Sequence, residues 1–453
     1  MPAFSEIDVA WAWAPYQPSE QVPWNMPRAA HLFRRAGFAA SQKQLLEAVR
    51  VEPQQCVEDL VSLRLESESF RQQMSDLVRA AMGTGNVQQL AAQWTYRMLH
   101  TPVPLLEKMT LFWHGHFATS AAKVEDAKLM LAQNELLRRH ALGDFNELLL
   151  EISRDPAMLI YLDSVSNRKA HPNENYAREI MELFALGEGN YSEQDIRELA
   201  RCFTGWEIKR EKFRFNRYQH DGGNKTVLGV SGKLGGEEGV QIVASQDSAP
   251  RFLLRKLVQF FLMDEPLASD SLIQPLAKQL RDDELRLEPT LRRILGSNLM
   301  FSAHVAGRKI RSPVELGIGF LRALEGSTDS FELAASFQRL GQGLYYPPSV
   351  KGWDGGRTWI NSSTLLGRSN LIRTLMENSK TRFAKGTLAE YLREQGVRSA
   401  DDLIHLFETL LFAVPIPAQA KERITQLYGT GGSEQRVREA VHALCTLPEF
   451  QLA

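Results

Sequence analysis

The fold class is decided by one segment, PNENYAREIMELFALG (residues 172–187). Residues 173–186 predict a helix that stops at Gly187, since glycine commonly follows the last turn of a helix. On a helical wheel the polar residues fall within about 100° of one another, and the rest of the circumference is apolar. Other elements must cover a helix of this kind. The polar stripe consists of Asn175, Arg178, Glu179 and Glu182, and the apolar side of Tyr176, Ala177, Ile180, Met181, Leu183 and Phe184.

Helical periodicity dominates on both sides of this segment, so the sequence predicts a mainly α protein with two helical halves. A glycine-rich stretch with alternating residues, such as Lys212 to Phe215, predicts a small β-ribbon between the halves. We expect four regions and one long loop, 341–370, which is rich in Gly, Pro and Trp. The regions are an N-terminal helical region (1–205), a β insert (206–247), a C-terminal helical region (248–385) and a small helical subdomain (386–453).

Helix boundaries follow from caps, prolines and glycines. Ser41, Ser192 with Asp195, and Ser399 with Asp402 are expected N-terminal caps. Pro104 and Pro313 are expected in first turns, where the missing N–H of proline costs nothing. The expected helices cover residues 27–36, 41–51, 54–82, 86–100, 104–113, 124–140, 144–153, 192–203, 248–263, 270–281, 287–297 and 312–324.

Composition excludes several function classes. The 453 residues are 43% hydrophobic and 24% charged, and the net charge is −1, which gives no support for binding nucleic acid or an anionic membrane. No run of apolar residues is long enough to span a membrane, and the first residues lack a secretory signal, so we expect a cytoplasmic protein.

Cys56, Cys202 and Cys445 are too far apart for a metal knuckle and are expected to be buried. Motifs for ATP, dinucleotides, zincin-type metals and α/β-hydrolase chemistry are absent.

The first candidate site is the pair His114 and His116 in the sequence WHGHF. Two histidines at i and i+2 point about 200° apart on a helix, so they can share a metal only if the helix is broken. Gly115 favours such a break, and neutral imidazole is a common metal ligand and general base. Alternatively, His116 packs among Met109, Phe112 and Trp113 as a satisfied core histidine.

The second candidate is the polar stripe of residues 175–182. Two carboxylates and an arginine on one stripe can bind a divalent cation or hold a substrate. The structural alternative is an Arg178–Glu182 pair one helical turn apart, with Asn173 or Asn175 acting as a cap.

Two further candidates lie in loops. His220 and Asp221 precede two glycines, a pattern that can bring polar groups to a ligand but is equally typical of a hairpin turn. Trp353 and Trp359, in the 341–370 loop, can stack on a sugar or peptide, or can anchor the loop to the core.

These stretches together resemble the bacterial family catalogued as domain of unknown function 1800. The resemblance covers nearly the whole chain, and Ala185 stands where the central motif often has Thr. It implies that His114 and His116, the segment 174–182, and His220 and Asp221 belong together. It also implies a possible partner, since the genes of the family often lie beside an alkaline phosphatase/sulfatase-like family. Many relatives are exported. The matching stretches are residues 32–38, 112–120, 155–163, 172–187, 191–206, 220–229, 347–356 and 447–451.

The leading hypothesis is a metal-dependent enzyme, a hydrolase or an oxidoreductase, with Zn, Mn or Fe bound by nitrogen and oxygen ligands. Arg178, Glu179, His220 and Asp221 would be catalytic, and Asn175, Trp353 and Trp359 would bind substrate. The alternative is a non-enzymatic assembly or binding partner of the phosphatase-like protein, in which the polar stripe is a buried structural network. The proposed metal ligands are His114, His116, Glu179, Glu182 and His220.

Overall fold

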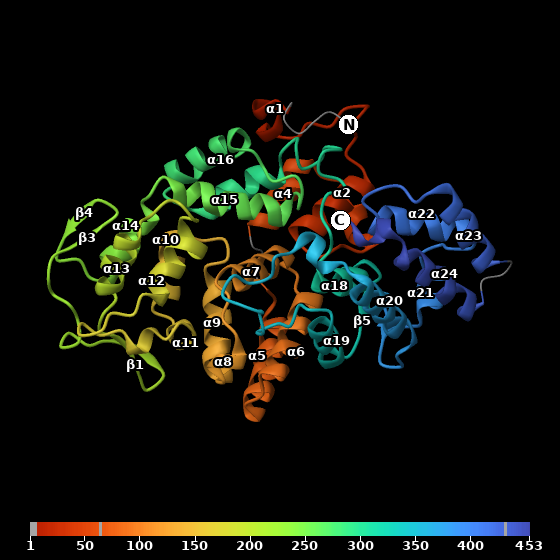
Figure 1. Cartoon of the computed structure of the whole chain (residues 1–453). Coiled ribbons are helices and arrows are strands. Elements are labelled where there is room, and N and C mark those ends of the chain that lie inside the picture. Colours follow the sequence, from red (N-terminus) through yellow and green to blue (C-terminus); the bar gives the residue numbers. More distant parts are fainter. Residues whose placement is uncertain (1–6, 63–65, 430–432) are drawn as a thin grey trace.

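The computed structural model describes residues 7–62, 66–429 and 433–453. Within these residues the chain forms 24 α-helices and three two-stranded antiparallel sheets, so the predicted mainly α fold is confirmed. None of the described helices is both long and apolar enough to cross a membrane. All three cysteines are free and buried, as predicted. The helices gather around the centre of the molecule, and α21 to α24 form its right-hand side in Figure 1.

The N-terminal helices have well-defined starts, several of them at the predicted residues. Asn25 caps α2, Ser41 forms a capping box with Gln44, and Pro104 begins α7. These helices are α1 Val9–Trp13, α2 Met26–Ala36, α3 Gln42–Ala48, α4 Pro53–Val61, α5 Glu68–Thr84, α6 Val87–His100, α7 Pro104–His116, α8 Ala121–Val124, α9 Ala127–Arg139, α10 Phe145–Ser153, α11 Pro156–Tyr161, α12 Asn175–Glu179 and α13 Glu193–Cys202.

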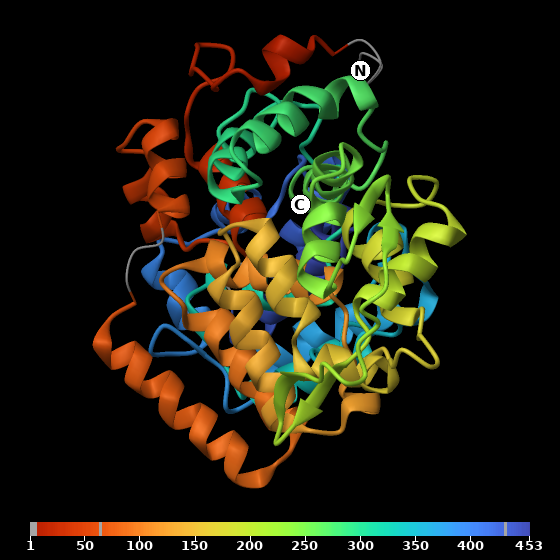
Figure 2. The same ribbon diagram turned by 90° about the vertical axis from the view of Figure 1, so that its left-hand side faces the viewer.

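The C-terminal helices follow the same pattern. Ser312 forms a capping box with Glu315 in front of Pro313, and Ser399 forms one with Asp402. They are α14 Gly236–Ala244, α15 Ser248–Phe261, α16 Asp270–Asp282, α17 Leu287–Leu295, α18 Pro313–Ala323, α19 Ser330–Arg339, α20 Ser362–Glu377, α21 Leu388–Glu394, α22 Ala400–Leu411, α23 Ala418–Tyr428 and α24 Glu434–Thr446. Helices α15 and α16, drawn in green in the upper part of Figure 2, pack against each other.

The strands are few and short. In the predicted insert, β1 (Trp206–Lys209) pairs with β2 (Lys212–Phe215), and β3 (Lys225–Val227) pairs with β4 (Val230–Gly232). The insert also contains α14, which the sequence analysis placed in a β region. A third pair, β5 (Gly326–Ser327) with β6 (Arg382–Phe383), was not predicted.

Some predicted boundaries were wrong. The helix expected over 54–82 is two helices, because Ser67 caps a new one at α5. The helix expected over 124–140 is α9, which begins three residues later because Asp126 is its N-cap. The long loop ends earlier than residue 370, since a 3-10 turn covers Gly356–Trp359 and Asn361 caps α20.

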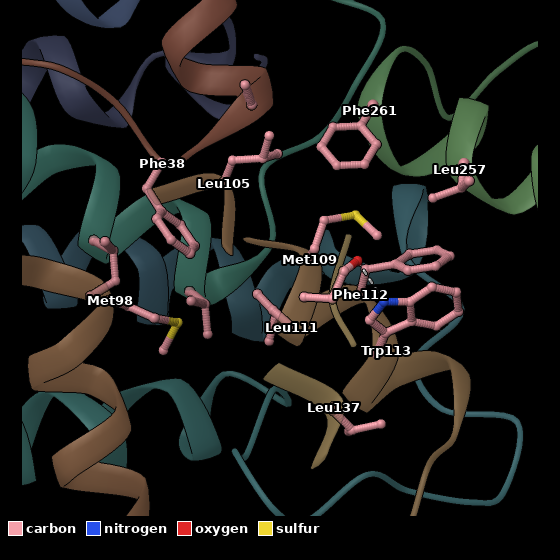
Figure 3. Packing of buried hydrophobic residues seen from close by; sticks show 14 of the residues in the cluster. Phe38, Met98, Leu105, Met109, Leu111, Phe112, Trp113, Leu137, Leu257 and Phe261 are labelled. Carbon is pink, nitrogen blue, oxygen red and sulfur yellow. Dashed lines mark hydrogen bonds between the residues drawn. The ribbon is translucent and has the colours of Figure 1, made fainter. Parts of the chain in front are cut away.

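Helix α7 lies in the middle of the hydrophobic core. Leu105, Met109 and Trp113 are completely or almost completely buried on it. In Figure 3, Leu137 of α9 is drawn nearest to Trp113, and Leu105 and Met109 are drawn nearer to Phe261 of α15. Buried hydrophobic residues from α1 to the last turn of the chain belong to this single cluster. The domain limits drawn from sequence stay a prediction.

The segment that predicted the fold is helical, but its second half is wider than an α-helix. After α12 the chain continues as a π-helix over Ile180–Ala185 and ends at Gly187, whose φ is +80°. Tyr176, Ile180 and Phe184 are buried, as the apolar side predicted. A π-helix closes its turns with i→i+5 bonds and often occurs at functional sites. A helical wheel drawn for an α-helix therefore does not predict which side chains share a face after residue 179.

Candidate functional site

A half-open cleft of about 390 Å³ lies where α7, α15, the segment before α18 and the loop before α20 meet. Its walls are aromatic and its floor carries charged side chains. The lining residues are Leu111, Phe112, Gly115, His116, Lys256, Gln259, Phe260, Asp264, Leu267, Lys309, Ser312, Glu315, Gln342, Lys351, Trp353, Asp354, Gly355 and Trp359.

The two histidines of α7 lie on opposite sides of that helix. The predicted break at Gly115 is absent, because α7 remains helical through His116. The loop approaches α7 closely here because residue 352 is glycine: a Cβ on Gly352 would lie 2.0 Å from the Gly115 carbonyl oxygen. The prediction that both histidines face one site was therefore wrong, and only His116 lines the cleft.

His116 and Lys256 form one hydrogen-bonded unit at the wall of the cleft. The Nε2 of His116 donates to the Phe184 carbonyl (2.9 Å), so its Nδ1 is the acceptor for the Lys256 ammonium (3.3 Å). Lys256 also donates to the carbonyl of Leu183 (2.9 Å). Both carbonyls belong to the π-helix. The end of segment 172–187 therefore holds the lysine and the imidazole in place.

Burial shifts the proton equilibria of this unit. Burial, and then the nearby charge of Lys256, hold the pKa of His116 well below its ordinary value. Burial, and then the charge of Lys351, lower the pKa of Lys256 to about 8. At neutral pH His116 is a neutral imidazole beside a mostly charged amine. Titratable groups with shifted pKa values in a cleft are typical of functional sites.

The floor of the cleft is a chain of buried ionic groups. Lys108, fully buried on α7, pairs with Glu315, and Lys309 lies 3.5 Å from Asp264. Glu315 also accepts from the Ser312 amide (2.7 Å) and Asp264 from the Ile310 amide (2.7 Å). Burial raises the pKa of Glu315, but the charges of Lys108 and Lys309 outweigh it and hold that pKa far below the usual range. Both floor carboxylates are therefore occupied by protein groups.

Aromatic rings enclose the remainder of the cleft. Phe260 lies with its ring 5.3 Å from the Lys108 ammonium and 5.4 Å from that of Lys309. Trp353 is fixed by a hydrogen bond from its Nε1 to the Gly341 carbonyl (2.9 Å), and Trp359 is buried. The structure thus brings both predicted tryptophans to the cleft, where they also anchor the loop.

His114 positions this loop from the other side of α7. Its Nε2 accepts a hydrogen bond from the backbone amide of Tyr345 (3.0 Å), so its proton resides on Nδ1. Tyr345 is buried and has a φ of +68°, a strained conformation for a bulky residue. Its ring and that of Trp353 both contact the imidazole. The contact requires a neutral His114, and burial lowers the pKa of this histidine to about 4.

Stability is therefore expected to fall as the pH drops from 7 to 5. In that range the unfolded chain protonates His114, with an ordinary pKa near 6.5, while the folded chain does not. The stabilisation is complete above the unfolded pKa and declines below it. His114 alone contributes about 2 kcal/mol of this loss at pH 5. Denaturant unfolding at both pH values should show a smaller pH effect for His114→Gln than for the unchanged protein, and an equal effect would contradict the assignment.

Comparison with known proteins connects these stretches to a family. The family model described as "Protein of unknown function (DUF1800)" matches residues 31–452, nearly the whole chain. The chain belongs to this family. The search of curated proteins and the search of solved structures gave no match. Three DUF1800 stretches meet at the cleft or support it: α7, the segment 172–187 and the loop 347–356.

Other predicted residues of the DUF1800 chain lie elsewhere. Arg178 forms a bidentate pair with Glu193 (2.9 Å for both bonds) and a longer contact with Glu174 (3.5 Å), rather than the predicted pair with Glu182. Asn175 is exposed, and its backbone amide donates to the side chain of Asn173. These two residues therefore act in the local structure at the start of α12.

Glu179, at the end of α12, and Glu182, on the π-helix, are both partly buried. Glu182 accepts from the hydroxyl of Tyr191 (3.1 Å). Burial, and then the charge of Glu182, raise the pKa of Glu179. Neither carboxylate lines the 390 Å³ cleft.

His220 and Asp221 belong to the loop that follows β2. The Nδ1 of His220 lies 2.9 Å from the Thr204 carbonyl, and Asp221 accepts from Arg201 (2.7 Å) and from the Gly223 amide (2.8 Å). Hydrogen bonding by Arg201 lowers the pKa of Asp221. Each group is satisfied locally, as in an ordinary turn.

The predicted metal ligands do not converge. Among the described residues no three His, Cys, Asp or Glu side chains are placed to hold a metal ion. His114 and His116 point apart, and His220 has its own partner in the loop after β2. The residues present therefore do not fit the metal site proposed from sequence. The metal content of the protein stays a prediction.

Sequence reasoning missed the charged residues of the cleft in this DUF1800 chain. Lys256, Lys309, Asp264 and Glu315 come from two segments that contain no recognised motif. The available signal was the charged pair Glu107 and Lys108 in the mostly apolar run of α7, which implied buried partners.

Proposed function

We propose that the chain binds a small organic anion in this cleft, with Lys256 at the anionic end and the aromatic walls around the organic part. A volume of about 390 Å³ falls in the range of small-molecule sites, roughly 300–1,000 Å³. Such sites combine apolar walls with a few polar groups that fix the orientation of the ligand.

One observation carries the proposal: Lys256 is the cation of the lining that has no carboxylate partner among the described residues. Lys309 lies next to Asp264, and Lys351 pairs with Asp354 at the rim (3.0 Å). An ammonium has three N–H donors. Two of those of Lys256 are used by Leu183 and His116. The third supports a charge-assisted hydrogen bond to a bound anion.

The rings on the walls support an organic rather than an inorganic ligand. Phe112, Phe260, Trp353 and Trp359 all line the cleft, and their faces and edges offer stacking and edge-to-face contacts. The proposal rests on these rings and on Lys256, since the sequence-predicted metal ligands are not gathered near them.

Two matched probes test the proposal, benzenesulfonate and its neutral analogue benzenesulfonamide. Calorimetric titration at pH 7.5 should detect benzenesulfonate and give much weaker or no binding for the sulfonamide. Lys256→Gln should weaken sulfonate binding about 10- to 100-fold, because a hydrogen bond to a charged group contributes about 1.5–3 kcal/mol. Glutamine retains a donor for the Leu183 carbonyl.

Lys351→Gln is the matched control. It removes a lysine from the same cleft, but one that is largely exposed and already paired with Asp354. Sulfonate affinity should then change by no more than about 3-fold. Equal binding of the two probes, or full affinity in the Lys256→Gln protein, would refute the proposed function.

A further inference from the structure

Four buried arginines lie together in the part of the core that the floor of the cleft faces. Arg34, Arg35, Arg311 and Arg368 are each less than 5% exposed. Their guanidinium groups donate to backbone carbonyls and one amide: Arg34 to Leu410, Arg35 to Val305 and Ala453, Arg311 to Leu411, and Arg368 to Arg311 and Gln451. None forms an ion pair with an Asp or Glu side chain of the described residues, but Arg35 contacts the terminal carboxylate of Ala453 (2.6 Å). Carbonyls satisfy N–H donors but leave the positive charge uncompensated.

Several donors of this group have no partner at all. Within the described residues the Nε of Arg34, the Nε and Nη1 of Arg35, and the Nη1 of Arg368 are buried and make no hydrogen bond. Arginine remains charged in proteins. An unpaired buried charge is costly unless an opposite charge lies nearby.

The two carboxylates of the cleft floor are the negative charges that these arginines face. The charges of Asp264 and Glu315 act on Arg35, and that of Glu315 acts on Arg311 and Arg368. Asp264 and Glu315 also serve Lys309 and Lys108. Both carboxylates line the cleft and none of the four arginines does, so the arginines lie on the protein side of the floor.

Charge counting shows a large positive excess at the floor. Four arginines, together with Lys108, Lys256 and Lys309, make seven cations. The negative groups of the described residues that oppose them are three: Asp264, Glu315 and the terminal carboxylate of Ala453. Low-dielectric surroundings make such a field strong at a ligand inside the cleft. A second negative charge on the ligand would then be attracted as well as the first.

We infer that the preferred ligand carries a dianionic, phosphate-like group on an organic body, as in a phosphomonoester or a phosphonate. This inference rests on the proposed function, since it assigns the charge of the anion that Lys256 binds. Lys256 contacts the phosphate oxygens. The positive field of Lys309 and the arginines favours a ligand with a second negative charge over a monoanion. The aromatic walls hold the organic body.

The test adds a third probe of the same shape, phenylphosphonate, which is largely dianionic at pH 7.5. At low ionic strength, phenylphosphonate should bind at least about tenfold more tightly than benzenesulfonate. Added salt should reduce this ratio of affinities. In Lys309→Gln the ratio should shrink, because loss of this positive charge weakens binding of the dianionic phosphonate more than binding of the monoanionic sulfonate. Inorganic phosphate should bind more weakly than phenylphosphonate, because it leaves the aromatic walls uncovered.

The outcomes separate the two proposals. If none of the probes binds, the proposed function and this inference both fail. If sulfonate binds as tightly as phosphonate, the proposed function stands and the dianion preference is refuted. If the ratio of phenylphosphonate to benzenesulfonate affinity changed neither with salt nor in Lys309→Gln, the role of the floor charges would be refuted. If inorganic phosphate bound as tightly as phenylphosphonate, the preference for an organic ligand would be refuted. The ratio and its salt dependence are measured on the unchanged protein, so the test does not depend on the folding of a variant.

Discussion

Replacing Gly352 with alanine is expected to lower the free energy of unfolding by about 2–5 kcal/mol and to remove ligand binding. Gly352 has a φ of +78°, where an L-residue is strained by about 1–2 kcal/mol. Its Cβ would also lie 2.0 Å from the Gly115 carbonyl oxygen. Since both partners are backbone, the loop must move away from α7, which displaces Trp353. Urea unfolding and titration with benzenesulfonate measure the two effects.

Gly355→Ala is the matched control for this prediction. Gly355 also has a positive φ, +75°, with a ψ of −167°, but its Cβ would meet no atom closer than 3.9 Å. It should therefore show backbone strain without a close contact, about 1–3 kcal/mol. If the two variants were equally stable, the close contact between the loop and α7 would be wrong.

Glu107→Gln is expected to destabilise the fold by about 3–5 kcal/mol, the usual effect of breaking a buried ion pair. Glu107 is completely buried on α7. It accepts from Arg97 (2.7 Å), from Arg138 (2.7 Å) and from the indole of Trp94 (2.8 Å). Glutamine removes the charge that compensates two arginines and presents an N–H group to donors. Chemical denaturation at pH 7 provides the measurement.

Arg138 offers a control, because its second carboxylate partner is exposed. Glu135 also pairs with Arg138, but its side chain is about half exposed. Glu135→Gln should therefore cost no more than about 1 kcal/mol. Burial raises the pKa of Glu107, but Arg138 and Arg97 outweigh it and hold that pKa below its usual value. The stabilisation by the Glu107 carboxylate is thus complete above the pKa that this group has in the unfolded chain. It is lost as the pH falls through the lower pKa that the group has in the folded protein. A loss similar to that of Glu135→Gln would contradict the buried network.

Much of the fold followed from local rules. Capping residues such as Ser41, Ser192 and Ser399 marked helix starts correctly, because their hydrogen bonds are made within one turn. The division of residues 54–82 was missed, since periodicity alone does not reveal a cap at Ser67. The strand pair β5–β6 joins residues more than fifty positions apart, and its two-residue strands leave no pattern in the sequence.

The site was predicted less well, because it depends on contacts between distant segments. His116, Trp353 and Trp359 do line the cleft, although the side-chain partner of His116 is Lys256 rather than a metal-ligand set. The wheel analysis assumed an α-helix through residue 186, and the π-helix changed which groups its end presents. Lysines such as Lys256 carry no motif, and only the packing of α15 against the end of that helix shows their role.

The wide turn of residues 180–185 makes the length of this segment as important as its composition. A π-helical turn holds an extra residue, so losing one residue would restore an α-helix without interrupting it. Residues beyond the deletion would rotate by about 100°, and the two carbonyls that hold Lys256 and His116 would turn away. A relative with a segment one residue shorter would keep the helix but release the ammonium group, and with it the cleft's fixed cation.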